Sequence, residues 1–329
     1  MPRKVEISHK TIIFTVLFLL ALWLVFQLRE IILVVFVAII LMSALNPAVD
    51  RLEKMRLPRW LAILLLYILL FASLGLALSS IIPPLVEQTG NFFNRIILYL
   101  REVNLFGIDF KTLVPQLSSQ IGSLSSDILR VTVGIFSNLT SLFFVLVITF
   151  YLLLERKNLN RYLLILFGEG GEKKAEAFID KIENRLGSWV RGEAILMTII
   201  GVMTYIGLRL LGIEFALPLA IVAGLLEVIP NIGPFASAVP AVFLALTISP
   251  VMALAVAALY FLIQQLEGSI IAPKIMQKAV GVNPLMVILS LAIGFKLAGV
   301  AGAVLAVPIV LVLQVVISEL SSWDRFKNL

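Results

Sequence analysis

The chain is dominated by long runs of apolar residues that almost no charge interrupts. Thr11 to Gln27 and Trp60 to Ile82 are two such runs, and a transmembrane helix needs roughly 17–25 predominantly apolar residues. Hydrophobic residues make up 60% of the 329 residues and charged residues 14%, against roughly 45–50% and about 25% in soluble domains. A soluble two-layer fold does not require apolar runs of this length. The sequence therefore predicts an all-α polytopic integral membrane protein.

Residues 1–82 are predicted to form three transmembrane helices. A basic stretch precedes the first run, but no small-residue cleavage site of a secretory signal follows it, and Arg29-Glu30 leads directly into a second run, Ile31 to Leu45. We interpret these two runs as a helical hairpin whose short second arm either extends through Ala48 or tilts little. The polar stretch Asn46 to Arg59 predicts the connection to the third helix.

The distribution of basic residues predicts the orientation of the chain. A fourth transmembrane helix is expected within residues 132–155, between two long connections, 83–131 and 156–192. Cytoplasmic loops collect Lys and Arg during insertion. Between Arg156 and Arg191 there are eight Lys or Arg residues, whereas residues 83–131 hold four. We therefore expect 156–192, both termini and the tail 321–329 on the cytoplasmic side of the cell membrane, and 83–131 outside.

Both long connections carry apolar residues at helical spacing, which predicts amphipathic helices in each. The apolar face expected in the inner connection consists of Ala175, Phe178, Ile182, Leu186 and Trp189. Such a helix can lie on the bilayer surface, cover the transmembrane bundle or pack against a neighbouring subunit. Packing on the membrane surface is the expectation here.

Residues 193–320 form the expected transport core, because Pro, Gly and polar side chains interrupt their apolar runs. One long run, Phe215 to Thr247, is interrupted at Glu227 to Pro234, and a second, Pro284 to Ser318, is interrupted at Gly294 to Gly302. Backbone groups freed by such breaks cannot face lipid unpaired. We therefore expect Pro230 to Pro234 and Gly294 to Gly302 to be non-helical and to face each other at membrane depth.

The two interrupted runs are typical of an inverted repeat. Each interrupted run follows a membrane span, and the two span-plus-run units have opposite orientations. Both runs contain an Ala-Val-Pro triplet, whose proline is Pro240 in the first and Pro308 in the second. Many secondary transporters build a substrate site from inverted repeats whose broken helices meet near the bilayer midplane. In the alternative interpretation these prolines are only kinks, which membrane helices tolerate.

The same breaks carry motifs that resemble the autoinducer-2 exporter (AI-2E) family. The motifs are Gly224 to Pro234 with its Pro-Asn-Ile-Gly-Pro segment, Gln265-Leu-Glu267 followed by Ile271 to Lys274, and Gly299 to Gly302 leading to Ala306-Val-Pro308. The resemblance covers nearly the whole chain, including the Asn46-Pro47 turn. It implies about eight membrane segments, homo-oligomers including pentamers, and export of small solutes such as autoinducer-2. It also implies that some members exchange sodium or lithium for protons.

A carboxylate inside an apolar segment is costly and is a candidate functional site by default. Glu227, three residues before Pro230, is the strongest candidate to carry a coupling proton, because desolvation favours the protonated form. In the alternative interpretation it bonds freed backbone amides near Asn231. Glu267 is a weaker candidate, expected at headgroup level, and Lys296 is a candidate counter-charge. The full predicted pathway consists of Glu227, Pro230, Asn231, Gly233, Pro234, Gln264, Gln265, Glu267, Asn283, Lys296, Gly299, Gly302 and Pro308.

Enzymatic functions find no support in the sequence. It has no phosphate-binding loop, no His-rich metal spacing and no nucleophile elbow, so no catalytic residue, metal site or cofactor is predicted. With no cysteine, a disulfide or thiolate site is excluded. The formal charge of +6 comes mainly from the expected cytoplasmic loops, which favours contact with membrane lipid and not with nucleic acid.

Three functions remain open. The first is a secondary transporter that exports a small polar, autoinducer-2-like solute, with the proton gradient as driving force. The second is a Na⁺(Li⁺)/H⁺ antiporter, and the third is a structural or regulatory membrane protein without transport. A cation site would want more than one carboxylate near the break, and only Glu227 and Glu267 qualify. This shortage favours solute export coupled to H⁺.

Overall fold

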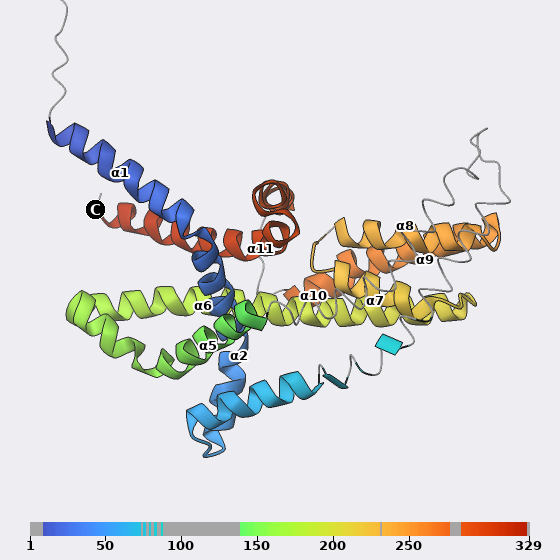
Figure 1. Cartoon of the computed structure of the whole chain (residues 1–329), viewed down its shortest axis with the longest axis horizontal. Helices are drawn as coiled ribbons and strands as arrows, with labels where there is room; N and C mark the ends of the chain where they lie inside the picture. Colours follow the sequence, from blue (N-terminus) through green and yellow to red (C-terminus); the bar gives the residue numbers. More distant parts are fainter. Residues whose placement is uncertain are drawn as a thin grey trace, which may run out of the picture.

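A computed structural model describes residues 9–73, 139–230, 232–276 and 284–327, together with a few residues between 75 and 87. Within these ranges the chain is helical apart from short turns, and no β-strand occurs (Figure 1). The expected outer connection, 83–131, lies almost entirely outside the described residues, as do Asn231 and Asn283. The all-helical class predicted from the sequence is confirmed.

Among the residues that the structure describes, four helices are long and apolar enough to cross a membrane. They are Arg29–Lys54, Gly171–Leu210, Pro250–Met276 and Leu285–Glu319, and three shorter apolar helices are Arg59–Ser73, Ala216–Leu226 and Ile232–Leu246. Many large apolar side chains on these helices point away from the protein, as lipid contact requires. The exact number of membrane segments stays a prediction.

The expected N-terminal hairpin is not formed. α1 (His9–Gln27) and α2 (Arg29–Lys54) continue one another through a slight bend at Leu28, where the amide of Leu28 bonds the carbonyl of Leu24 and the amide of Ile32 bonds the carbonyl of Leu28. Gln27 to Glu30 contains no glycine or proline to end the helix, and Figure 1 shows the two helices running on from each other. The predicted Asn46-Pro47 turn is also absent, because Pro47 lies inside α2.

The N-terminal scaffold packs α2, the helix Arg59–Ser73 and α5 (Leu139–Glu155) against one another. Its core is formed by Met42, Val49, Ala62, Ile63 and Leu153. A 3₁₀ turn, η2 (Arg156–Asn158), then leads into α6 (Leu159–Leu210), the longest helical element. α6 turns back at Gly168, whose φ of 69° lies in the left-handed region that glycine adopts readily.

The long limb of α6 joins the expected inner amphipathic helix to the following span without interruption. Its predicted apolar face is buried at Leu186 and Trp189, and Trp189 packs against Val307 and Leu311 of α11 (Pro284–Lys327). This end of the face therefore covers the helical bundle, and packing of the remainder on the membrane surface stays a prediction. In Figure 1, α2 crosses near the middle of α6, and α7 to α9 lie along its C-terminal half.

The C-terminal half contains two helical hairpins. α7 (Ala216–Leu226) and α8 (Ile232–Leu246) form the first, and they share a core with α6 and α9 (Pro250–Leu266). Leu208, Phe215, Leu244 and Val256 are among the buried members of that core. A π-helical turn, η3 (Glu267–Ile271), and the short α10 (Ala272–Met276) extend α9. The second hairpin is α11, which bends back on itself.

Both interruptions are shorter than predicted. α8 begins at Ile232, so Gly233 and Pro234 are helical; proline is accommodated there because the first amides of a helix have no intrahelical acceptor. In α11 only Ala298 and Gly299 leave the helical region, with φ of 60° at Gly299. Gly294, Lys296 and Gly302 are helical, because a single glycine in a left-handed conformation suffices to reverse the chain.

The arms of α11 meet through two glycines. A Cβ atom on Gly302 would lie 2.0 Å from the carbonyl oxygen of Gly294, and a Cβ atom on Gly294 would lie 2.3 Å from that of Gly302. The hairpins also match in detail, since Pro240 lies eight residues after Ile232 and Pro308 eight residues after Val300. Two helix-break-helix units are therefore present, with the Ala-Val-Pro segments at equivalent places in their second arms.

Candidate functional site

Glu227 lies at the break of the first hairpin, directly after α7. Its amide closes the last turn of α7 by bonding the carbonyl of Ala223, and Pro230 prevents the helix from continuing. The residue is only 2% exposed. Its Oε2 atom has no hydrogen-bond partner among the described residues. A fully buried carboxyl group with an unused oxygen is costly unless it binds a proton or a cation.

Glu267 approaches Glu227 from a second element. It is the first residue of η3, and its carboxylate accepts a hydrogen bond of 3.1 Å from Nε2 of Gln264 one turn earlier. Glu267 is buried within the protein, and its expected place at headgroup level stays a prediction. Isolated π-helical turns are rare and occur frequently at functional sites, because the extra residue redirects a side chain.

The carboxyl groups of Glu227 and Glu267 are close enough to interact directly. Two carboxylates cannot hydrogen-bond each other unless one oxygen carries a proton, because an ionised carboxylate only accepts. A proton on one of the two groups would let them share a hydrogen bond. This contact is the chemical centre of the candidate site.

Glu193 supplies a third carboxyl group that was not predicted from the sequence. It lies on α6, is 5% exposed, and interacts electrostatically with both Glu227 and Glu267. Three buried carboxyl groups from α6, α7 and η3 thus converge, although the described residues contain no group arranged to hold a metal ion in the usual geometry. The sequence signal that could have identified Glu193 was its position directly before the apolar run Ala194 to Leu211.

The predicted pathway residues divide into two groups. Gln264 joins the carboxyl cluster through Glu267, and its own Oε1 atom is buried without a partner among the described residues. Gln265 and Lys296 are exposed, so Lys296 is not buried beside a carboxylate as a counter-charge would be. Asn231 and Asn283 fall outside the described residues.

The first hairpin break packs against the arms of α11, and a contact with the second break at Ala298 and Gly299 stays a prediction. Ile229, within the first break, packs against Leu291, Ala303 and Ala306 on both arms of α11. Gly233 makes the first turn tight, because a Cβ atom there would lie 1.9 Å from the carbonyl oxygen of Leu226. Gly299, Gly302 and Pro308 belong to the α11 hairpin, whose arms pack against Ile229, and Gly302 acts through its contact with Gly294.

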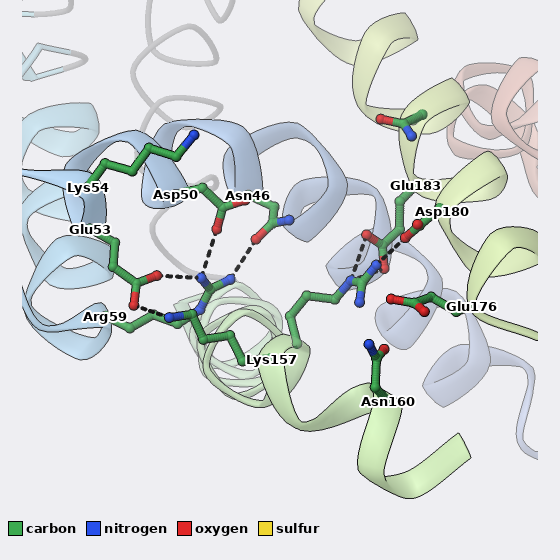
Figure 2. A pocket seen from close by; sticks show the side chains of 12 residues that line it. Asn46, Asp50, Glu53, Lys54, Arg59, Lys157, Asn160, Glu176, Asp180 and Glu183 are labelled. Carbon is green, nitrogen blue, oxygen red and sulfur yellow. Dashed lines mark hydrogen bonds and ion pairs between the residues drawn. The ribbon is translucent and has the colours of Figure 1, made fainter. Parts of the chain in front are cut away.

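A polar cavity of about 730 Å³ lies apart from the carboxyl cluster, where α2, η2 and α6 come together (Figure 2). Arg59 reaches across it: Nη1 donates to Asp50 at 2.7 Å and to Glu53 at 3.0 Å, and Nη2 donates to Asn46 at 2.7 Å. The Nε atom of Arg59 donates to the carbonyl of Leu153 on α5 at 2.7 Å. The hydrogen bonds of Arg59 thus join the three helices of the N-terminal scaffold.

Arg156 makes the corresponding connection to α6. Its guanidinium donates to Glu183 and Asp180, and Lys157 pairs with Glu53. Burial opposes the charge on Arg156, but the hydrogen bonds and charges of Glu183 and Asp180 outweigh burial and raise its pKa, so it stays cationic. The two basic connections predicted to share the cytoplasmic side are therefore bound to each other.

Fold and site define a class of protein: an all-helical chain with helices of membrane-spanning length and a cluster of buried carboxyl groups where α6, the first hairpin break and η3 converge. The family model described as "AI-2E family transporter" matches residues 12–322. The chain therefore belongs to the AI-2E transporter family, as its motifs indicated.

Relatives with curated names support the family. The "Putative transport protein YrrI" of Bacillus subtilis (strain 168) is 28% identical over 308 residues, which cover 89% of this chain and 87% of the relative. The "AI-2 transport protein TqsA" of Escherichia coli (strain K12) is 28% identical over 298 residues, covering 88% of this chain and 84% of the relative. A shorter match, 37% identical over 116 residues, links 35% of this chain to the E. coli K12 "Putative transport protein YhhT".

Proposed function

We propose that this protein is a secondary transporter that exports a small polar solute, similar to autoinducer-2, across the cytoplasmic membrane and is driven by the proton gradient. The observation that carries the proposal is the contact between the buried carboxyl groups of Glu227 and Glu267 at a helix break. Intramembrane carboxyl groups of this kind form proton relays in transporters. The name of TqsA supports an autoinducer-2-type solute.

Proton coupling follows from the chemistry of the pair. While the shared proton is bound, the cluster carries less negative charge, and α6, the first hairpin break and η3 can remain packed around it. Loss of that proton leaves Glu227, Glu267 and Glu193 repelling each other in a low-dielectric site, which favours opening. A transporter that must bind a proton to close on one side and release it on the other is driven by the proton gradient.

Na⁺(Li⁺)/H⁺ antiport is the second candidate, and Glu193 is the observation that favours it. The sequence offered two carboxylates near the break, whereas the structure brings three together with the free Oε1 atom of Gln264. Carboxylate and amide oxygens are the ligands that hard cations prefer. A desolvated alkali cation could replace the shared proton at the same oxygens, so the two candidates use one site.

The remaining alternative, a membrane protein without transport, predicts that the two breaks do not form a pathway. Packing of Ile229 against α11 speaks for a common site, and membership in a transporter family agrees with it. We further propose that residues 156–192 and both termini are cytoplasmic and that the chain forms homo-oligomers, including pentamers. The ion-paired cavity supports one shared side for residues 46–59 and 156–192.

Reconstituted vesicles distinguish the candidates. Purified protein is placed in liposomes that enclose a pH-sensitive dye, and an imposed proton gradient drives uptake of an autoinducer-2-type furanone. Solute export predicts gradient-driven furanone flux without a pH response to NaCl or LiCl. Antiport predicts a pH change on adding NaCl or LiCl. If the protein remains folded and shows neither furanone flux nor a pH change on adding NaCl or LiCl, the proposal is wrong.

A further inference from the structure

A proline inside α2 leaves one backbone acceptor without its helical donor. Pro47 has no N–H group, so it cannot donate to the carbonyl of Ser43, four residues earlier. The hydroxyl of Ser43 is engaged elsewhere and donates to the carbonyl of Ile39 at 2.7 Å. A buried carbonyl without a donor is destabilising, so the Ser43 carbonyl needs a partner from outside α2.

Arg191 of α6 provides that partner. Its Nη1 atom donates to the carbonyl of Ser43 at 3.2 Å and to that of Ala44 at 3.0 Å, and Nη2 lies 3.4 Å from Oγ of Ser188. Among the residues that the structure describes, Arg191 has no ion pair; its charged neighbour on α2 is Arg51, which has the same sign. The guanidinium therefore acts as a hydrogen-bond donor to backbone and not as a salt-bridge partner.

Glycine lets the two helices come close enough for these bonds. A Cβ atom on Gly187, one turn before Arg191, would lie 2.1 Å from the carbonyl oxygen of Ser43. The same carbonyl is thus approached by the backbone of α6 at Gly187 and capped by the side chain of Arg191. The crossing of α2 and α6 is fixed at the point where Pro47 opens the α2 hydrogen-bond ladder.

This crossing lies immediately before the carboxyl cluster. Gly192 faces α10, where a Cβ atom would lie 2.9 Å from Sδ of Met276. Glu193 follows directly and meets Glu227 and Glu267. The turn of α6 that carries Glu193 is therefore held between α2 on one side and α10 on the other.

We propose that Arg191 is a positioning residue for the carboxyl site. By donating a hydrogen bond to the carbonyl that Pro47 leaves without a donor, it fixes the position of α6 along its axis relative to α2, and with it the position of Glu193. The inference rests on the proposed role of the carboxyl cluster for its functional meaning. The positioning of α6 by Arg191 is argued from the α2–α6 contact alone. It predicts that the need for Arg191 disappears when position 47 regains an amide hydrogen.

The test compares Arg191→Met, Arg191→Lys, Pro47→Ala and the double variant Pro47→Ala/Arg191→Met in the full chain. Arg191→Met keeps side-chain length but removes the donors. Arg191→Lys keeps a cationic donor that reaches the same carbonyls. Pro47→Ala restores the amide that bonds the carbonyl of Ser43. Each variant is reconstituted at matched amounts of folded, monodisperse protein.

Two readouts are used. Dicyclohexylcarbodiimide reacts with buried protonated carboxyl groups, and peptide mass spectrometry gives the modified fraction of Glu193, Glu227 and Glu267 at one fixed pH. Gradient-driven furanone flux is measured on the same vesicles. Arg191→Met is expected to change the distribution of label among the three residues and to lower flux at least about tenfold, the factor for losing one charge-assisted hydrogen bond. Arg191→Lys and the double variant are expected to stay within about threefold of the parent.

The labelling separates this inference from the proposed function. If wild-type protein shows no flux, a label distribution that shifts in Arg191→Met and returns in the double variant still supports the positioning role. Unchanged labelling in folded Arg191→Met, or no return in the double variant, would overturn it. If Arg191→Met does not accumulate while the double variant does, the rescue itself supports the pairing of Arg191 with Pro47; if neither accumulates, the proposed pairing is wrong.

Discussion

The contact between Gly294 and Gly302 makes a quantitative prediction for the α11 hairpin. Alanine at position 302 would place its Cβ atom 2.0 Å from the carbonyl oxygen of Gly294 and 2.7 Å from its carbonyl carbon. An ordinary contact begins at 3.4 Å, so the arms must separate by about 1.4 Å at this point. The obstructing atoms are backbone atoms, which cannot rotate away as a side chain can.

The expected cost of Gly302→Ala follows from that geometry. Overpacking typically costs 1–3 kcal/mol, and a backbone obstruction places this change near the upper limit, about 3 kcal/mol. Close helix approach through glycine is also the main source of helix–helix stability within a membrane. For a chain of 329 residues, the apparent midpoint of thermal unfolding should fall by roughly 4 °C.

The assay is size-exclusion chromatography of detergent-solubilised protein after heating, with the midpoint read from the remaining monodisperse peak. Gly75→Ala is the matched control, since a Cβ atom there meets nothing within 4 Å. The control should equal the parent or gain slightly from alanine's higher helix propensity. A Gly302→Ala midpoint equal to that of Gly75→Ala would refute the close packing of the two arms.

Three further predictions concern orientation, the scaffold and the third carboxyl group. A cysteine introduced at Lys173 should react with a membrane-impermeant maleimide only after the cells are opened; labelling of intact cells would contradict a cytoplasmic α6 limb. Arg59→Met should lower unfolding stability by about 2 kcal/mol, measured by the same thermal assay, because Asp50 and Glu53 lose a shared donor but remain partly hydrated. Glu193→Gln should abolish any Na⁺- or Li⁺-induced pH change and should also lower gradient-driven furanone flux, because one of the three repelling carboxyl groups is lost; equal pH responses in both proteins would exclude Glu193 from a cation site.

The general architecture of the chain was predictable because it depends on local sequence. Apolar runs define helices of membrane length, and Pro230 and Gly299 mark the two places where the backbone cannot remain helical. The burial of Glu227 followed from the cost of a carboxylate in an apolar segment. These features need no knowledge of which helix lies beside which.

Features that depend on distant contacts were not predictable. Glu193 looks like an ordinary residue at the end of a polar connection until α6 is shown to be continuous and packed beside η3. Pro47 predicts a turn from the sequence alone. The helix continues through it because Arg191, more than one hundred residues later, donates the hydrogen bond that Pro47 cannot. Gly294 and Gly302 look like helix breakers, although they are helical contact points between two arms.

The most direct test of proton coupling is Glu227→Gln in proteoliposomes, since glutamine keeps the shape of glutamate and much of its hydrogen-bonding capacity but cannot titrate. Folding and oligomerisation should be nearly unchanged, gradient-driven accumulation of an autoinducer-2-type furanone should be lost, and passive exchange of the furanone down its own gradient should continue. Gradient-driven flux equal to that of the parent, at matched protein levels, would contradict the proton-carrying role of Glu227.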